Sequence, residues 1–106
     1  MNHEESIIQK SIVQELRHRG ILIFSVPNEF VKDARSMGTA LSLGLLPGVS
    51  DLVCVLPYGK TVFFEVKAEK GKQSPTQEKF EKNVVLRGHC YHVVRGLDEV
   101  LKILDT

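Results

Sequence analysis

An α/β domain built around one mixed sheet is the fold that this sequence predicts, and three observations lead to it. Two β-rich runs, residues 50–56 and 61–67, flank a turn signal at residues 57–60. Residues 74–77, Ser-Pro-Thr-Gln, have the composition of a helix start and stand before a further β-rich run. Apolar residues recur at helical spacing near both ends of the chain. One sheet of four strands flanked by helices accommodates this order.

The first half of the chain predicts a helix, a strand and a segment that is harder to assign. Ile8, Ile12 and Leu16 form an apolar stripe, so residues 3–19 are expected to be an amphipathic helix. Asn2 is its candidate N-cap, and Gly20 is expected to end it. Residues 21–26 predict a buried strand that ends at Pro27. A short helix from Lys32 to Leu43 is possible within the turn-rich stretch that follows.

The second half is more regular. The hairpin is expected over residues 50–67, with its turn at Tyr58-Gly59. Ser74 as N-cap, Pro75 at the first helical position and Gln77 at the third complete a capping box for a helix that runs to Arg87. Residues 89–95 predict the fourth strand, and apolar residues between 97 and 104 predict a closing helix.

Composition sets mild bounds. A chain of 106 residues and 11.9 kDa is expected to form a single domain over residues 1–106. No apolar run reaches membrane-spanning length, and the acidic N-terminus does not resemble a signal peptide. Cys54 and Cys90 lie in apolar runs without metal-binding spacing, which favours reduced core thiols in a cytosolic protein. The formal net charge of +1 averages over unlike regions.

Two carboxylates and one ammonium are expected at one end of the hairpin. Folding about Tyr58-Gly59 brings position 52 opposite position 65, which leaves Asp51 one step from Glu65 across the ladder. Glu65 and Lys67 share a strand face because side chains alternate. Two neighbouring acids repel each other unless a cation lies between them, and a divalent metal with oxygen ligands is the natural occupant.

Simpler explanations exist for each of these residues. Asp51 could be an ordinary turn residue, and Lys67 could be only a salt-bridge partner of Glu65. Glu65, however, follows three apolar residues in a strand expected to be buried on both faces. A buried carboxylate needs a partner, so the metal-site interpretation is preferred.

Four motifs in this order resemble the VRR-NUC domain of the PD-(D/E)xK nuclease superfamily, including its stand-alone viral and bacterial members. They are Glu5-Ser6-Ile7-Ile8-Gln9, Gly48-Val49-Ser50-Asp51, Glu65-Val66-Lys67 and Ser74-Pro75-Thr76-Gln77. The resemblance covers about residues 4–101, and Ser50 stands where the superfamily name has proline. It implies a restriction-endonuclease-like core and a metal-dependent DNA endonuclease in the cytoplasm of a bacterial or phage-infected host cell.

The resemblance also implies roles for individual residues. Mg²⁺ (or Mn²⁺) would be held by Glu5, Asp51, Glu65 and the Val66 carbonyl, and Lys67 would assist the attacking water or stabilise the developing charge. Gln77 would face the active site, although capping alone explains it. Glu5 would equally suit the positive end of the first helix. Gln9 would orient Glu5 or contact a phosphate.

Nucleic-acid contacts are expected from basic residues around the hairpin turn and the helix after Lys67: Lys60, Lys70, Lys72, Lys79 and Lys82. Stand-alone relatives resemble Holliday-junction resolvases, which implies a homodimer acting on branched DNA. Residues 39–46 are apolar enough to supply the dimer surface. The alternatives are a catalytically inactive nucleic-acid-binding module with the same fold and, less well supported, a subunit of a larger replication complex. A zinc site at His89, Cys90 and His92 is disfavoured, because the two histidines would lie on opposite strand faces.

Overall fold

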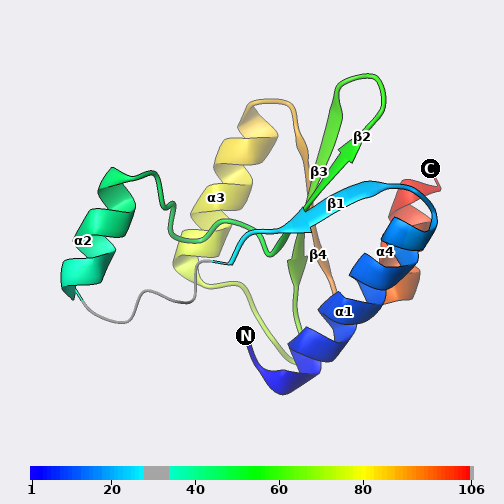
Figure 1. Ribbon diagram of the computed structural model, residues 1–106, viewed down its shortest axis with the longest axis horizontal. Coiled ribbons are helices and arrows are strands. Elements are labelled where there is room, and N and C mark those ends of the chain that lie inside the picture. Colours follow the sequence, from blue (N-terminus) through cyan, green and yellow to red (C-terminus); the bar gives the residue numbers. More distant parts are fainter. Residues whose placement is uncertain (28–33, 106) are drawn as a thin grey trace.

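A mixed four-stranded sheet forms the centre of the protein, as predicted (Figure 1). The computed structural model describes residues 1–27 and 34–105. The strands are β1 (Leu22–Ser25), β2 (Leu52–Leu56), β3 (Lys60–Val66) and β4 (Cys90–Val94), in that spatial order. The β1–β2 and β2–β3 pairs are antiparallel, and β3 and β4 are parallel. The helices are α1 (His3–His18), α2 (Ala34–Ser42), α3 (Pro75–Leu86) and α4 (Leu97–Leu104).

The predicted helix starts at Asn2 and Ser74 are confirmed. The Asn2 side chain accepts a hydrogen bond from the backbone N–H of Glu5, at 2.7 Å. The Ser74 hydroxyl accepts from the Gln77 N–H, and the Gln77 side chain accepts from the Ser74 N–H, which completes the capping box. These local hydrogen bonds anchor α3 directly after the loop that follows Lys67.

The hairpin register differs by one residue from the predicted one. Leu52 pairs with Phe64 and not with Glu65, and the last pair before the loop is Leu56 with Lys60. The loop therefore contains residues 57–59, with positive φ at both Tyr58 and Gly59, where the prediction assumed a two-residue turn. Loop length sets register in a hairpin. Continuing the observed register places Asp51 directly opposite Glu65.

The prediction of a buried strand at residues 21–26 is wrong in its burial. β1 lies at the edge of the sheet, and Ile23 is its one buried residue. Leu22 and Phe24 alternate with Ile23 and remain 61% and 43% exposed. A continuous apolar run does not distinguish a central strand from an edge strand, because neighbours in the sheet decide which face is covered.

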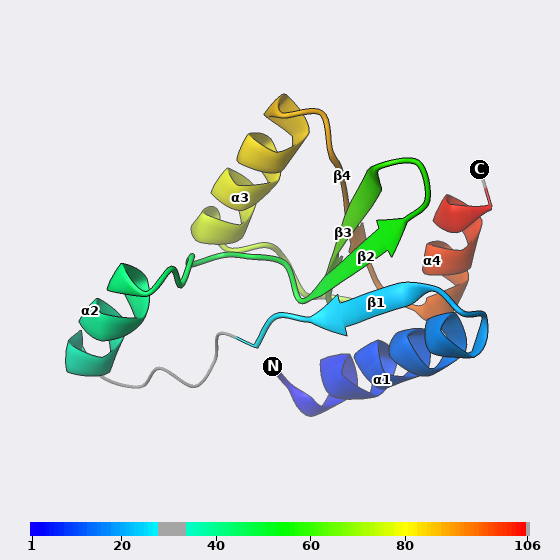
Figure 2. The same cartoon turned by 45° about the horizontal axis from the view of Figure 1, so that its top comes forward.

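Helices cover the two faces of the sheet unequally (Figure 2). α1 and α4 pack on one face, where Ile12, Leu16 and Val100 meet the sheet residues Phe64 and Val66, all 0% exposed. α3 packs on the other face through a smaller cluster of Phe80, Val84 and Tyr91, with Phe63 beside it. The main core therefore lies between the sheet and the α1–α4 layer.

α2 stands apart from the rest of the protein in both views (Figures 1 and 2). Within the described residues it packs against no other helix or strand. Its presence agrees with the short helix considered for this segment, although the proposed start at Lys32 lies outside the described residues. No helix in residues 1–27 or 34–105 combines the length and the apolar character needed to cross a membrane.

Candidate active site

Glu65 is a nearly inaccessible carboxylate near the end of the central strand β3. Its residue is 2% exposed, and its chain neighbours Phe64 and Val66 point into the main core on the opposite face. Alternation therefore turns Glu65 and Lys67 toward the face that α3 covers. Glu65 is buried because its neighbours Phe64 and Val66 pack in the main core and thereby fix the strand between two covering layers.

Asp51 lies across the ladder from Glu65 at the start of β2. Its Oδ2 atom accepts a hydrogen bond from the backbone N–H of Val66, at 2.8 Å. Its own carbonyl oxygen accepts from the Val26 N–H, at 3.0 Å, at the end of β1. These bonds fix Asp51 to both neighbouring strands and place its carboxylate beside that of Glu65.

The two oxygens of Glu65 have different surroundings. Oε2 accepts from the side-chain amide of Gln77 at 3.0 Å and lies 3.5 Å from the Lys67 ammonium nitrogen, whose side chain is 12% exposed. Oε1 is buried and has no hydrogen-bond partner among the described residues. A buried carboxylate oxygen without a donor is costly unless a cation or a proton satisfies it.

Burial, followed by the charge of nearby Asp51, raises the pKa of Glu65 to about 8, and Lys67 opposes the shift without cancelling it. Near neutral pH the metal-free protein therefore holds a proton at the Asp51–Glu65 pair. A bound divalent cation would displace that proton, because the cation stabilises the ionised form of both carboxylates. The pair consequently has the electrostatic character of a cation site.

The donor set fits a divalent metal of the magnesium type, which uses one or two protein carboxylates and is otherwise hydrated. Among the described residues, no three or more His, Cys, Asp or Glu side chains are grouped closely enough to hold a metal ion. The structure thus brings together Asp51 and Glu65 but does not place Glu5 in one cluster with them. Glu5 Oε2 is directed instead to the Ala68 N–H, at 3.4 Å, just beyond Lys67.

Gln77 reaches the site because α3 begins beside it. Its side chain uses its oxygen for the capping box and its nitrogen for Glu65, so both functions considered for it coexist. Gly48 secures the approach: a Cβ atom there would lie 2.2 Å from the Thr76 carbonyl oxygen, and its φ is +84°. Only glycine allows the segment before Asp51 to contact the first turn of α3 so closely.

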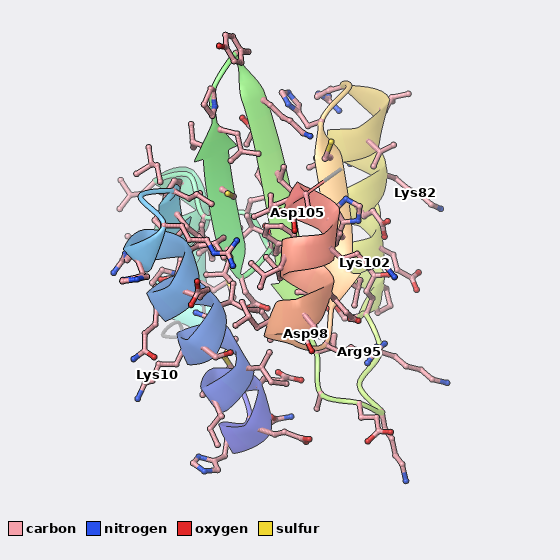
Figure 3. The ribbon with its side chains drawn as sticks, turned by 90° about the vertical axis from the view of Figure 1, so that its right-hand side faces the viewer. Lys10, Lys82, Arg95, Asp98, Lys102 and Asp105 are labelled. Carbon is pink, nitrogen blue, oxygen red and sulfur yellow. The ribbon has the colours of Figure 1, made fainter. Side chains whose placement is uncertain are left out.

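The remaining predicted residues come from elements on both faces of the sheet. Gln9 lies on α1, and its Oε1 atom is buried without a hydrogen-bond partner in the described chain. Lys70 and Lys72 are exposed on the loop after Lys67. Lys79 and Lys82 are exposed on α3, and Lys82 points away from the body (Figure 3). Lys60 begins β3, so about 16 Å of strand, at about 3.3 Å per residue, separates it from Glu65.

The histidines of the disfavoured zinc site are separated by the sheet. His89 makes an edge contact with Phe63, on the α3 side, while His92 packs near Phe64, on the side of the main core. They therefore serve as ring partners of two phenylalanines on opposite faces.

Arg95 is a site-supporting residue that sequence reasoning missed. One guanidinium nitrogen donates to the carbonyl oxygens of Ala68, Glu69 and Gly71, the loop that directly follows Lys67. Figure 3 shows Arg95 beside this loop, beneath α4. These hydrogen bonds, called the Arg95 clasp below, fix the backbone of the loop that follows Lys67 and carries Lys70 and Lys72. Its one sequence signal, an arginine immediately after a strand, is too common to be diagnostic.

A second missed network lies between α3 and β4. The Gln73 side chain donates to Glu81 at 2.9 Å and to the Tyr91 hydroxyl at 3.2 Å. Burial raises the pKa of Tyr91, so its hydroxyl stays neutral and serves as a fixed hydrogen-bonding group. This network ties the loop before Ser74 to α3 and thereby supports the position of Gln77.

Comparisons with known proteins agree with this architecture. No protein-family model and no curated protein matches the sequence. A solved structure described as "VRR_NUC domain" superposes with a TM-score of 0.70 at 25% identity, covering 98% of this chain and 97% of that one. Another, described as "VRR_NUC domain protein", has a TM-score of 0.77 at 16% identity over 99% and 88%. The chain therefore has the nuclease-like fold of these VRR-NUC domain structures.

Proposed function

We propose that this protein is a metal-dependent DNA endonuclease that hydrolyses phosphodiester bonds. The observation that carries the proposal is the buried Asp51–Glu65 pair, in which Glu65 Oε1 has no donor among the described residues and Lys67 lies 3.5 Å from Oε2. An acid buried in a core strand beside a second acid is costly for stability, and such groups typically mark a reactive site.

Each residue has a distinct task in this proposal. Asp51, Glu65 and the Val66 carbonyl would hold Mg²⁺ or Mn²⁺. Glu5, in the first turn of α1, accepts a hydrogen bond from the Ala68 N–H and would complete the set by turning its carboxylate toward the pair. The cation, when bound, would polarise the scissile phosphate and lower the pKa of a water molecule. Lys67 stabilises negative charge developing on the phosphate or positions the attacking water. Gln77 donates to Glu65 Oε2 through its amide and so leaves Oε1 available as a ligand.

DNA is the proposed substrate because exposed lysines lie on the loop after Lys67 and on α3, the two segments that adjoin the acid pair. Lys70 and Lys72 lie on the loop held by Arg95, and Lys79 lies on α3 beyond Gln77. Such contacts follow the phosphate backbone and carry little sequence information. We also propose a phosphate contact for Gln9 of α1.

We also propose that the protein acts as a homodimer on branched DNA, as expected for a junction-resolving enzyme in the cytoplasm. One chain has a single set of Asp51, Glu65 and Lys67, and paired cuts require two sites related by a two-fold axis. Residues 39–46 support the dimer, since Leu41 and Leu43 are 46% and 83% exposed on a segment that packs on no other helix or strand of the described chain.

Cleavage of supercoiled plasmid and of a labelled four-way junction tests the proposal. With Mg²⁺ or Mn²⁺ the wild type should cut both, and the junction faster. Asp51→Ala and Glu65→Ala should each abolish cleavage with the fold intact by circular dichroism. The matched control is Glu69→Ala, because Glu69 is exposed and contributes its backbone carbonyl to the Arg95 clasp.

Two outcomes would contradict the nuclease proposal. Near-normal cleavage by a folded Glu65→Ala variant would place the reactive site elsewhere. Salt-sensitive DNA binding by a wild type that cuts nothing with either metal would favour the alternative, a catalytically inactive binding module with the same fold.

A further inference from the structure

Two apolar features of this chain remain unmatched within it, and the first is α2 with the turn that follows it. Residues 34–45, called the arm below, pack on no other helix or strand of the described chain. From Met37 to Leu45 the arm contains no charged side chain, and Leu43 is 83% exposed. An uncharged apolar segment of this kind can be buried without desolvating any ion.

The second feature is an apolar groove of about 700 Å³ on the α3 face of the sheet. Its lining includes Leu46, Pro47 and Val49 from the connection before β2, Phe63 of β3, and Phe80 and Val84 of α3. The groove adjoins the candidate active site, since Phe63 lies two residues before Glu65 on the same strand face and Thr76 lies beside Gln77. Lys79, Asn83 and Arg87 of α3 line its rim.

Two local features of the backbone direct the arm away from the groove of its own chain. The Leu45 N–H donates to the Ala40 carbonyl and the Gly44 N–H to the Leu41 carbonyl, which caps α2 with a left-handed glycine. Gly48 is held against Thr76 by the close approach described above. Folding back onto the same groove would disrupt one of these. In Figure 1 α2 accordingly lies at the outer end of the connection that leads to β2, away from α3.

We propose that the groove of one copy receives the arm of a second copy, and that the exchange is reciprocal. Each chain offers one arm and one groove, so a two-fold axis matches both pairs at once and leaves no unfilled arm or groove. The partly negative carboxyl end of α2, which carries no basic residue in its last turn, suits a rim containing Lys79 and Arg87.

This inference deepens the dimer part of the proposed function by naming the acceptor surface, and it does not depend on nuclease chemistry. Its consequence for the site is direct. The partner's arm would lie along α3 next to Thr76 and Gln77, so the surface beside each Glu65 would be made by two chains. DNA entering one site would then contact both copies.

Sedimentation velocity on two matched leucine variants tests the arm. Leu43→Glu places a charge on the arm, and Leu86→Glu places one on α3 outside the groove lining; both leucines are 83% exposed. We expect Leu43→Glu to raise the dimer dissociation constant by at least about tenfold, as for a central interface residue. Leu86→Glu should leave it unchanged. A wild type that is monomeric at micromolar concentration, or equal effects of the two variants, would overturn the inference.

A complementation experiment identifies the groove as the acceptor. Asn83→Arg should obstruct the groove from its exposed rim and produce a monomer by itself. Mixing it with Leu43→Glu restores one intact arm–groove pair, so a heterodimer should form although neither variant dimerises alone. If the dimer formed instead by packing of one arm against the other, mixing the two variants would not restore a dimer. That result would contradict the inference.

Cross-linking gives a second measurement that does not rely on obstruction. Leu43→Cys and Asn83→Cys, each with Cys90→Ser, are mixed and treated with a short bis-maleimide. A heterodimer linked between these positions is expected. In a chain that carries both Leu43→Cys and Asn83→Cys, links within one chain would show that the arm folds back on itself. Plasmid nicking by Leu43→Glu is measured in parallel. If the protein did not cut DNA but the cross-link still formed, the nuclease proposal would fail and this inference would remain valid.

Discussion

The two faces of the central sheet differ in what they contribute, and strand β3 supplies residues to both. On one face Val62, Phe64 and Val66 are at most 1% exposed and pack beneath α1 and α4. On the other, Phe63, Glu65 and Lys67 face α3, where burial is incomplete and a groove remains. Because the face beneath α1 and α4 is closely packed, β3 can carry a buried acid on its other face. The packing of the core offsets the free energy lost by burying that acid.

The largest expected effect comes from breaking the closed face. Phe64→Ala should lower the free energy of unfolding by about 3–5 kcal/mol, because it leaves a cavity between the sheet and α1. Phe63→Ala is the matched variant on the opposite face and should cost less than half as much, since Phe63 is half-buried against the groove. Urea denaturation of both variants checks the comparison. Equal losses would mean that the two faces contribute equally to stability.

Lys67→Ala tests the reactive face with little effect on the core. Turnover should fall by about 100-fold or more, the scale of a lost electrostatic or proton-transfer contribution. Binding of Mn²⁺ measured by calorimetry should persist, because Lys67 donates no metal ligand. Lys67→Arg should not restore turnover, since guanidinium is larger and does not release a proton. Collapse of metal binding together with activity would show a structural role for Lys67.

The acid pair should make the metal-free protein less stable as pH rises. The folded state holds a proton on Glu65 up to a pKa of about 8, whereas the unfolded chain releases it near 4.5. Stability from this group is therefore complete below the lower value and is lost as pH rises through the higher one. Urea midpoints in EDTA at about pH 5 and about pH 8 measure the difference.

Glu65→Gln should flatten this pH dependence, because a neutral amide replaces the titrating group. Glu69→Gln, on the exposed loop, serves as the control and should keep the wild-type slope. A slope that persists unchanged in Glu65→Gln would assign the titration to another group.

The smallest expected effect is a difference in DNA binding between lysines near the two ends of β3. Lys70→Ala with Lys72→Ala should reduce the slope of log affinity against log salt by about one to two, at about 0.9 per phosphate contact. Lys60→Ala should change the slope less, since Lys60 lies at the hairpin end of the strand. Binding to a labelled junction at several salt concentrations measures both slopes. An equal change for Lys60 would extend the DNA track along the whole hairpin.

Arg95 and Gln77 show what separates predictable from unpredictable parts of the site. The capping role of Gln77 depends on Ser74, three residues away, and was visible in the sequence. Its hydrogen bond to Glu65 depends on how α3 is placed over the sheet. Arg95 clasps a loop more than twenty residues earlier in the chain, as its bonds to Ala68 and Gly71 show. Local spacing contains no information about such a contact.

The sequence by itself determined the helix starts at Asn2 and Ser74, the order of the elements, and the shared face of Glu65 and Lys67. All three follow from interactions between residues close in the chain or from the two-residue period of a strand. Tertiary structure alone decided the register that sets Asp51 opposite Glu65 and the exposure of β1. These depend on loop conformation and on which layer covers each face, and both are properties of the assembled sheet.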